Sequence, residues 1–113
     1  MSSVPNQWDF IDNVDNHFKF DFTQSFDEQI VKLKSVNGGA FKRGSHNYFV
    51  LEALFYGNTV DDYMNRPTGA NGMPINNIRT RVAQLRNEWN ICIGSRWSPA
   101  GKFKEYMIYG RES

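Results

Sequence analysis

Cysteine is almost missing from this sequence of 113 residues, because Cys92 is the only one. A single thiol cannot form a disulfide within the chain. Its neighbours Ile91 and Ile93 predict that Cys92 is a small apolar filler in a strand rather than a reactive thiol. Without a covalent cross-link, a chain of this length relies on a single hydrophobic core, which predicts a protein about one domain in size.

Long apolar runs are absent as well. No stretch approaches the roughly 20 apolar residues that a helix needs to cross a bilayer. The first ten residues, MSSVPNQWDF, lack the basic and apolar regions of a secretory leader. We therefore expect a cytoplasmic protein that does not associate with membranes.

Residues with the spacing of a metal site or of a catalytic group are also lacking. His17 and His46 are isolated in the sequence, and no second cysteine or histidine lies near Cys92. The adjacent Asp61 and Asp62 would point about 100° apart on a helix, which is unsuitable for a catalytic pair of carboxylates. We therefore expect a protein that is not an enzyme and that needs no metal and no cofactor.

The sequence does contain enough apolar material to fold, and its charge is unevenly distributed. Hydrophobic residues make up 40% of the chain and aromatic residues 15%, so burial can offset the entropy that folding costs. Residues 1–41 carry three lysines against six carboxylates, whereas residues 42–111 carry ten lysines and arginines against five carboxylates. The basic second part indicates a polyanion or an acidic partner.

The acidic first part, residues 1–41, is predicted to be an N-terminal extension with one helix. Its large aromatic residues are Trp8, Phe10, Phe18, Phe20 and Phe22. Their spacing is loosely helical at first and then strictly alternating, so helix and strand both stay open for this stretch. So many aromatic side chains predict that the extension packs on the rest of the chain or forms a homodimer interface.

The helix of the extension is predicted over residues 26–36. Ser25 and Glu28 have the spacing of a capping box, in which each side chain accepts a hydrogen bond from the backbone N–H of the other residue. Ile30 and Leu33 are expected to face inward.

The basic second part begins with two predicted helices. Ser45 is suited to cap a helix of about three turns that Gly57 ends. Thr59 and Asp62 have the spacing of a second capping box and predict a short helix as far as Met64. The run of glycine, proline and asparagine that follows predicts a loop.

A long amphipathic helix over residues 74–89 comes next, and a hairpin follows it. Pro74 suits the first position of a helix. At about 100° per residue, one apolar stripe holds Ile75, Ile78, Val82, Leu85 and Trp89. Two strands, over residues 91–97 and 103–109, are joined by a five-residue connection with glycine, which predicts a β-hairpin.

This α+β order, three helices followed by a β-hairpin wing, is typical of a winged helix-turn-helix, which we assign to residues 42–113. The run GMPINNIRTRVAQLRNEW at residues 72–89, the ICI after it and KFKEYMIY at residues 102–109 resemble small winged helix-turn-helix proteins of bacteriophages and prophages. The resemblance covers roughly residues 44–110 and implies DNA binding. One departure is the loop over residues 65–73, which is longer than the tight turn usual in such proteins.

The polar face of the long helix supplies the candidate base contacts. Its members are Asn76, Asn77, Thr80, Arg81 and Gln84. Amide side chains match the hydrogen-bonding edge of adenine and arginine matches that of guanine in the major groove. Solvated helix faces usually mix glutamate with lysine, and this face has no acidic residue, which favours a reading surface over an ordinary solvated one.

Basic residues beside this face supply the candidate contacts to the DNA backbone. They are Arg79, Arg86, Arg96, Lys102 and Lys104. Arg79 and Arg86 lie at the edges of the apolar stripe and fit either phosphate contacts or salt bridges. The three hairpin cations fit phosphate contacts or a strand edge that lysines protect from pairing. Trp97 is interpreted as a lid on the hairpin, with a stacking platform as the alternative.

These patterns predict sequence-specific binding of double-stranded DNA, as a transcriptional regulator or a recombination accessory protein, and the resemblance implies a phage origin. The alternative is a protein-interaction module, such as a small phage inhibitor of a host protein, because winged helices also serve as docking surfaces. Salt-dependent binding to random duplex DNA would separate the two hypotheses.

Overall fold

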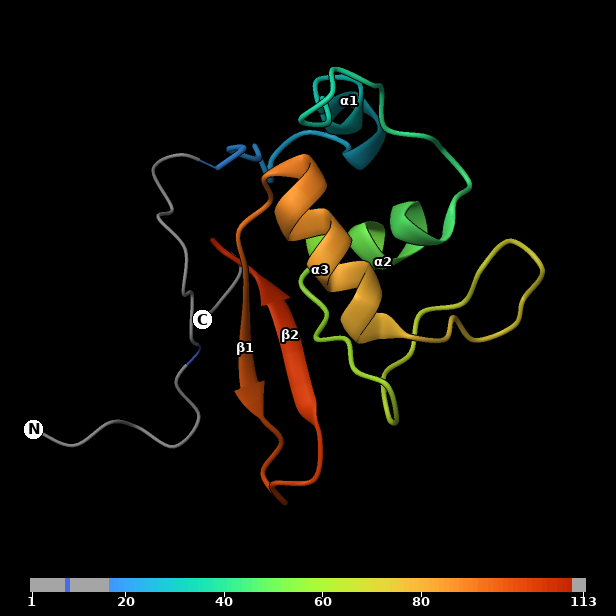
Figure 1. The fold of residues 1–113 in the computed structure, drawn as a ribbon, viewed down its shortest axis with the longest axis vertical. Helices are drawn as coiled ribbons and strands as arrows, with labels where there is room; N and C mark the ends of the chain where they lie inside the picture. Colours follow the sequence, from blue (N-terminus) through green and yellow to red (C-terminus); the bar gives the residue numbers. More distant parts are fainter. Residues whose placement is uncertain (1–7, 9–16, 111–113) are drawn as a thin grey trace, which may run out of the picture.

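Three helices and one antiparallel hairpin make up the regular structure of the computed structural model, which describes Trp8 and residues 17–110. The helices are α1 Phe26–Ile30, α2 His46–Phe55 and α3 Ile78–Trp89, and the strands are β1 Ile93–Trp97 and β2 Lys104–Ile108. In Figure 1, α1 lies at one end of the molecule and the tip of the hairpin at the other. The α+β class that the sequence predicts is confirmed.

Helix α2 forms where its capping residue predicts. The Ser45 side chain accepts a hydrogen bond from the backbone N–H of Tyr48 at 3.1 Å, which satisfies one of the N–H groups that a helix start leaves unpaired. The helix buries one face, consisting of Val50, Leu51, Leu54 and Phe55. These side chains pack against α3 and β2 in the core.

Helix α3 begins four residues later than the sequence predicts. Asn77, its N-cap, has the left-handed conformation with φ of 60°, which interrupts a helix that would start at Pro74. Pro74 instead forms an antiparallel bridge with Thr68 in the preceding loop. The predicted apolar stripe is nevertheless confirmed, because Ile75, Ile78, Val82, Leu85 and Trp89 are all buried.

The short helix predicted from Thr59 to Met64 does not form. The side chain of Asp61 accepts hydrogen bonds from the backbone N–H groups of the next residues, Tyr63, Met64 and Asn65, which holds them in a turn. Val60 pairs with Tyr106 of β2 in an antiparallel bridge. Two helices rather than three therefore lie between Ser45 and the hairpin, and the third helix of the described chain is α1 of the extension.

The hairpin is slightly shorter than predicted and pairs in a simple register. Ile93 faces Ile108 and Trp97 faces Lys104 across the two strands. The bridge from Val60 to Tyr106 attaches the segment after α2 to the other edge of β2. This attachment holds the hairpin beside the helices, and in Figure 1 it runs alongside α3.

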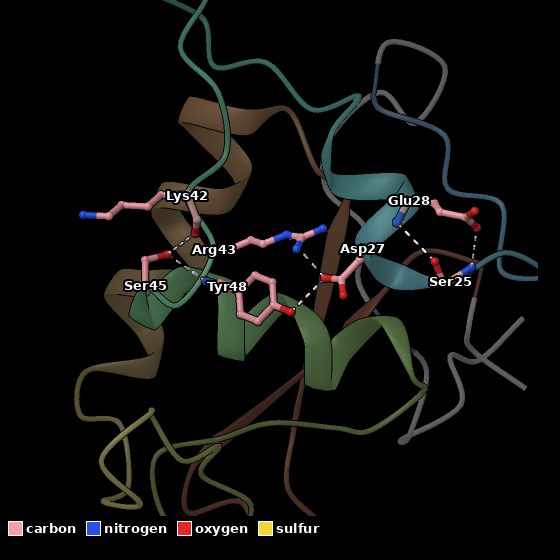
Figure 2. Close-up of polar contacts among 7 residues, drawn as sticks. All are labelled: Ser25, Asp27, Glu28, Lys42, Arg43, Ser45 and Tyr48. Atoms are coloured by element: carbon pink, nitrogen blue, oxygen red, sulfur yellow. Dashed lines mark hydrogen bonds and ion pairs between the residues drawn. The ribbon is translucent and has the colours of Figure 1, made fainter.

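Helix α1 has the predicted cap but fewer residues than expected. Both hydrogen bonds of the capping box between Ser25 and Glu28 are present (Figure 2). The helix ends at Ile30 rather than at Val36. Further along the segment, Lys34 forms an antiparallel bridge with Ala40, and the backbone N–H of Val36 donates to the backbone carbonyl of Glu88 in the last turn of α3 at 2.8 Å. A contact with another element thus outweighs the local helical preference of this segment.

The extension packs on the rest of the described chain. Phe20 and Phe22 contact Phe55 of α2, with ring centroids 5.7 and 5.2 Å apart, and Phe18 also packs against the core. The Phe18–Phe22 stretch forms neither helix nor strand. Phe10 lies outside the described residues, and a homodimer interface stays a prediction.

Polar contacts also join α1 to α2. The Tyr48 hydroxyl donates a hydrogen bond to the Asp27 carboxylate at 2.9 Å, and Arg43 lies 3.8 Å from the same oxygen (Figure 2). Burial, followed by the hydrogen bond to Asp27, raises the pKa of Tyr48 to about 12. The neutral hydroxyl is therefore the form that donates across this contact at physiological pH.

Candidate functional site

A cleft of about 550 Å³ lies between α3 and the hairpin. Helix α3, the hairpin and the segment after Val60 all contribute to its walls. The lining residues are Asp62, Tyr63, Arg79, Ala83, Arg86, Ser95, Trp97, Lys102, Phe103, Lys104 and Tyr106. In Figure 1, α3 begins on the side of the molecule toward which the hairpin tip points.

Backbone geometry explains why these residues share one cleft. Arg79, Ala83 and Arg86 follow the spacing of four and three residues that puts side chains on one face of a helix. On the hairpin, Trp97 and Lys104 form a facing pair, and pairs two residues apart project from the same face of a sheet. The cleft is therefore built from one face of α3 and one face of the hairpin.

The cleft is strongly basic. Arg79, Arg86, Lys102 and Lys104 line it, and Asp62 is the single carboxylate among the lining residues. Asp62 accepts a hydrogen bond from the backbone N–H of Ile78 at 2.8 Å, so its negative charge lies at the positive end of the α3 dipole. Four cationic side chains around one concave surface create the positive potential that attracts an anion.

Arg86 has a structural bond as well as a place in this cleft. Its Nε and Nη2 atoms donate to the backbone carbonyl of Ile93 at 2.9 and 2.7 Å, which ties α3 to β1. Its guanidinium carbon also lies 5.9 Å from the centroid of the Tyr106 ring. Burial raises the pKa of the Tyr106 hydroxyl, while the charges of Arg86 and Arg79 oppose this shift.

Arg96 lies on the other side of the hairpin. It pairs with Glu105 across the strands, where its Nε is 2.9 Å from the carboxylate, and its guanidinium carbon lies 4.2 Å from the centroid of the Trp8 ring. Four of the five residues predicted to contact the DNA backbone therefore line the cleft. Arg96 instead pairs with Glu105 of the protein itself, on the opposite face of the sheet.

Three of the five predicted base contacts are exposed around the start of α3. Thr80 lies in the first turn of the helix, and Asn76 and Asn77 immediately precede it. The Asn76 side chain also accepts a hydrogen bond from Arg66. This exposed group adjoins the cleft through Arg79, the neighbour of Thr80 in the chain.

Arg81 and Gln84 face α2 instead. The Gln84 side-chain oxygen accepts from Arg81 at 3.4 Å and from Asn47 of α2 at 3.1 Å. Both side chains are half-buried, and the Nε atom of Arg81 is fully covered. The polar face predicted from the sequence is therefore divided, with one part exposed and the other bonded between two helices.

Among the aromatic residues of the cleft, Trp97 was weighed as a stacking platform in the sequence, whereas Tyr63 and Phe103 were missed as functional candidates. Tyr63 was assigned to a helix that does not form, and its ring lies 5.3 Å from that of Phe103. The Lys104 ammonium lies 5.4 Å from the centroid of the Trp97 ring, whose side chain is 56% exposed. The alternation of Lys102, Phe103 and Lys104 is the signal that could have indicated this mixture of aromatic and basic groups.

Comparisons with known proteins add no assignment, because no family model matches the chain and no curated protein or solved structure does. None of the helices in residues 17–110 has the length and the apolar character to cross a membrane. In the same part of the chain, no three His, Cys, Asp or Glu side chains gather as metal ligands would.

Proposed function

We propose that this protein binds double-stranded DNA in a sequence-specific manner, as a transcriptional regulator or a recombination accessory protein of the winged-helix type. The exposed start of α3 contacts base edges in the major groove, and the cations of the cleft contact the phosphates alongside. The observation that carries the proposal is the gathering of Arg79, Arg86, Lys102 and Lys104 between this helix and the hairpin.

The order of the elements supports a winged-helix arrangement. A hairpin follows α3 directly in the sequence and is held beside the helices through the bridge of Val60 to Tyr106. Phosphate contacts on the hairpin would fix the register of the protein on the duplex, while the helix reads the bases. The turn around Asp61 stands where a winged helix-turn-helix has the helix that precedes its recognition helix. The approach of α3 to DNA therefore depends on the hairpin.

The cap of α3 affects which groups hold phosphate. A helix start without an acidic neighbour attracts anions, but here the carboxylate of Asp62 accepts from the first helical N–H. The phosphates are therefore bound by the long basic side chains rather than by the helix start. Such contacts make affinity fall steeply with salt concentration.

The first test is the salt dependence of binding to a duplex of random sequence. Each phosphate contact adds about 0.9 to the slope of log K against log salt. We expect Lys102→Ala and Lys104→Ala each to reduce this slope by about one unit and to weaken all sequences alike. Fluorescence anisotropy of a labelled duplex between 50 and 200 mM salt would measure it.

Lys34→Ala is the matched control for this test, because Lys34 is exposed and lies outside the cleft. It removes the same charge and should leave the slope nearly unchanged. An equal effect of Lys34→Ala would assign the attraction to net charge alone. The absence of any duplex binding at micromolar protein and low salt would overturn the proposal, because even non-specific binders reach dissociation constants of about 10⁻⁴ to 10⁻⁶ M at physiological salt.

Recognition of the DNA base sequence requires a second test, on a preferred binding site selected from a random duplex library. Thr80→Ala and Asn76→Ala should each cost about 1–3 kcal/mol on that site and much less on random DNA, because a base contact carries discrimination. Asn77 is less suitable, since its left-handed conformation would be strained in alanine. Asn87→Ala is the control, because Asn87 is an exposed amide near the other end of α3. Equal losses of affinity for Asn76→Ala and Asn87→Ala on both DNAs would argue against contacts to base edges.

One observation favours a protein-interaction module as the second candidate function. Tyr63, Met64 and Met73 in the segment between α2 and α3 are 70%, 75% and 62% exposed. Exposed aromatic and methionine side chains are enriched where proteins dock. If every DNA test above fails, protein binding through this exposed surface becomes the proposed function.

A further inference from the structure

We propose that the cleft between α3 and the hairpin binds an unpaired nucleotide. Its base stacks on the exposed ring of Trp97 or Tyr63, and its flanking phosphates contact the cations that line the cleft. This inference deepens the proposed function and rests on it for the class of partner, a nucleic acid. It adds a preference for DNA that carries an unpaired base or a single-stranded end.

The aromatic side chains of the cleft carry the first part of the argument. Tyr63 is 70% and Trp97 56% exposed, although aromatic rings supply much of the burial energy of a fold. They come from separate segments, the turn after Val60 and the end of β1, and both line this cleft. The turn that presents Tyr63 is held by the buried carboxylate of Asp61, so the ring stands on an ordered backbone.

The position of the cations carries the second part. The Lys104 ammonium lies 5.4 Å from the centroid of the Trp97 ring, and Lys102 and Arg79 line the same cleft. Aromatic faces interleaved with positive charges are the combination that single-stranded nucleic acid needs, because its bases stack on the rings while its backbone follows the charges. A partner without negative charge would leave these cations unpaired.

Shape and stacking favour an unpaired base, rather than a base pair of a duplex, as the group that the rings of the cleft contact. The cleft measures about 550 Å³, within the range of about 300–1,000 Å³ of pockets that hold single small ligands. In a duplex, the faces of each base are covered by the neighbouring base pairs, so an aromatic side chain cannot reach them unless the base is unstacked. A cleft of this size with exposed rings therefore fits one unstacked nucleotide.

The test compares two short labelled oligonucleotides of equal length and charge, one of thymidine and one of abasic sites. Stacking contributes to binding only when a base is present, and its loss should weaken binding by about 5- to 150-fold per base. We expect the thymidine strand to bind more tightly than the abasic strand by at least the lower figure. Equal affinity for both strands would overturn the inference and leave a cleft that binds phosphate only.

Two variants connect this preference to the cleft. Trp97→Ala should remove most of the difference between the strands, while Trp97→Phe keeps a ring and should retain it. Tyr56→Leu is the matched control, because Tyr56 is also 56% exposed and lies outside the cleft. Should Trp97→Ala fail to fold, as judged by circular dichroism, Tyr63→Ala gives the same test from an irregular segment. A full preference in both Trp97→Ala and Tyr63→Ala would overturn the assignment to this cleft.

A blunt duplex and the same duplex with a single-stranded end separate this inference from the proposed function. Tighter binding of the duplex with the overhang supports both. Equal binding of the two duplexes overturns the inference and keeps the proposed function. Binding of the overhang and of the thymidine strand without binding of the blunt duplex overturns the proposed function and keeps the inference.

Discussion

Replacing Asp61 with alanine should lower the free energy of unfolding by about 2–4 kcal/mol, a large share of the stability of a small domain. Asp61 is completely buried, and its Oδ1 atom accepts from the backbone N–H groups of Tyr63 and Met64 at 2.6 Å and of Asn65 at 3.3 Å. Hydrogen bonds to a charged group contribute about 1.5–3 kcal/mol each. The desolvation of its second, buried oxygen, for which the described chain shows no partner, offsets part of that sum.

The neighbouring carboxylate supplies the control for this prediction. Asp62 is less buried and accepts one backbone hydrogen bond, from Ile78, so Asp62→Ala should cost about 0.5–2 kcal/mol, as the loss of a helix cap does. Asp61→Asn keeps the size and an acceptor and should lose less than Asp61→Ala. Urea denaturation of the three variants measures the differences. Equal costs for Asp61→Ala and Asp62→Ala would show that the turn after Val60 does not depend on Asp61.

Leu85→Ala should destabilise the fold by about 2–5 kcal/mol, because truncation of a fully buried leucine removes its apolar contacts and leaves a cavity. Leu85 has 0% exposure on the buried face of α3. Its backbone carbonyl also accepts from Asn90 and Ile91 at the end of the helix, so the residue lies where α3 turns into β1. Thermal or urea unfolding followed by circular dichroism gives the loss directly.

Asn87→Ala tests whether such a loss belongs to the core rather than to α3 in general. Asn87 is exposed two residues further along the same helix, and surface substitutions of this kind usually stay within about 0.5 kcal/mol. A cost below about 1 kcal/mol for Leu85→Ala would contradict the burial of this position. Unchanged stability in both variants would mean that α3 does not contribute to the core.

Local chemistry was sufficient to predict several elements. Ser45 caps α2 and Ser25 caps α1 because a hydroxyl near an unpaired backbone N–H acts within three residues. The apolar stripe of α3 and the alternation that leads into the hairpin follow from the periods of the helix and the strand. These signals are short-range, and the structure agrees with them.

The errors occurred where a contact with another segment competes with a local preference. Thr59 and Asp62 have the spacing of a capping box, but Val60 pairs with β2 and Asp62 caps α3 instead. The start of α3 was placed too early because Pro74 suits a first helical position, whereas it bridges to Thr68 in the structure. The partners of Val60 and Asp62 lie 46 and 16 residues away, beyond a local window of the sequence. The partner of Pro74 is closer in the chain, but its bridge depends on how the loop folds back.

The candidate site divides in the same way. The sequence by itself determined its ingredients, a polar helix face and a group of cations around a hairpin, because residue type and periodicity are local properties. Only the tertiary structure decided that Gln84 bonds to Asn47 of α2, that Arg96 lies across the sheet and that Tyr63 joins the cleft. The reason is physical: which face of an element stays exposed depends on what packs against it, and packing brings together residues that are far apart in the chain.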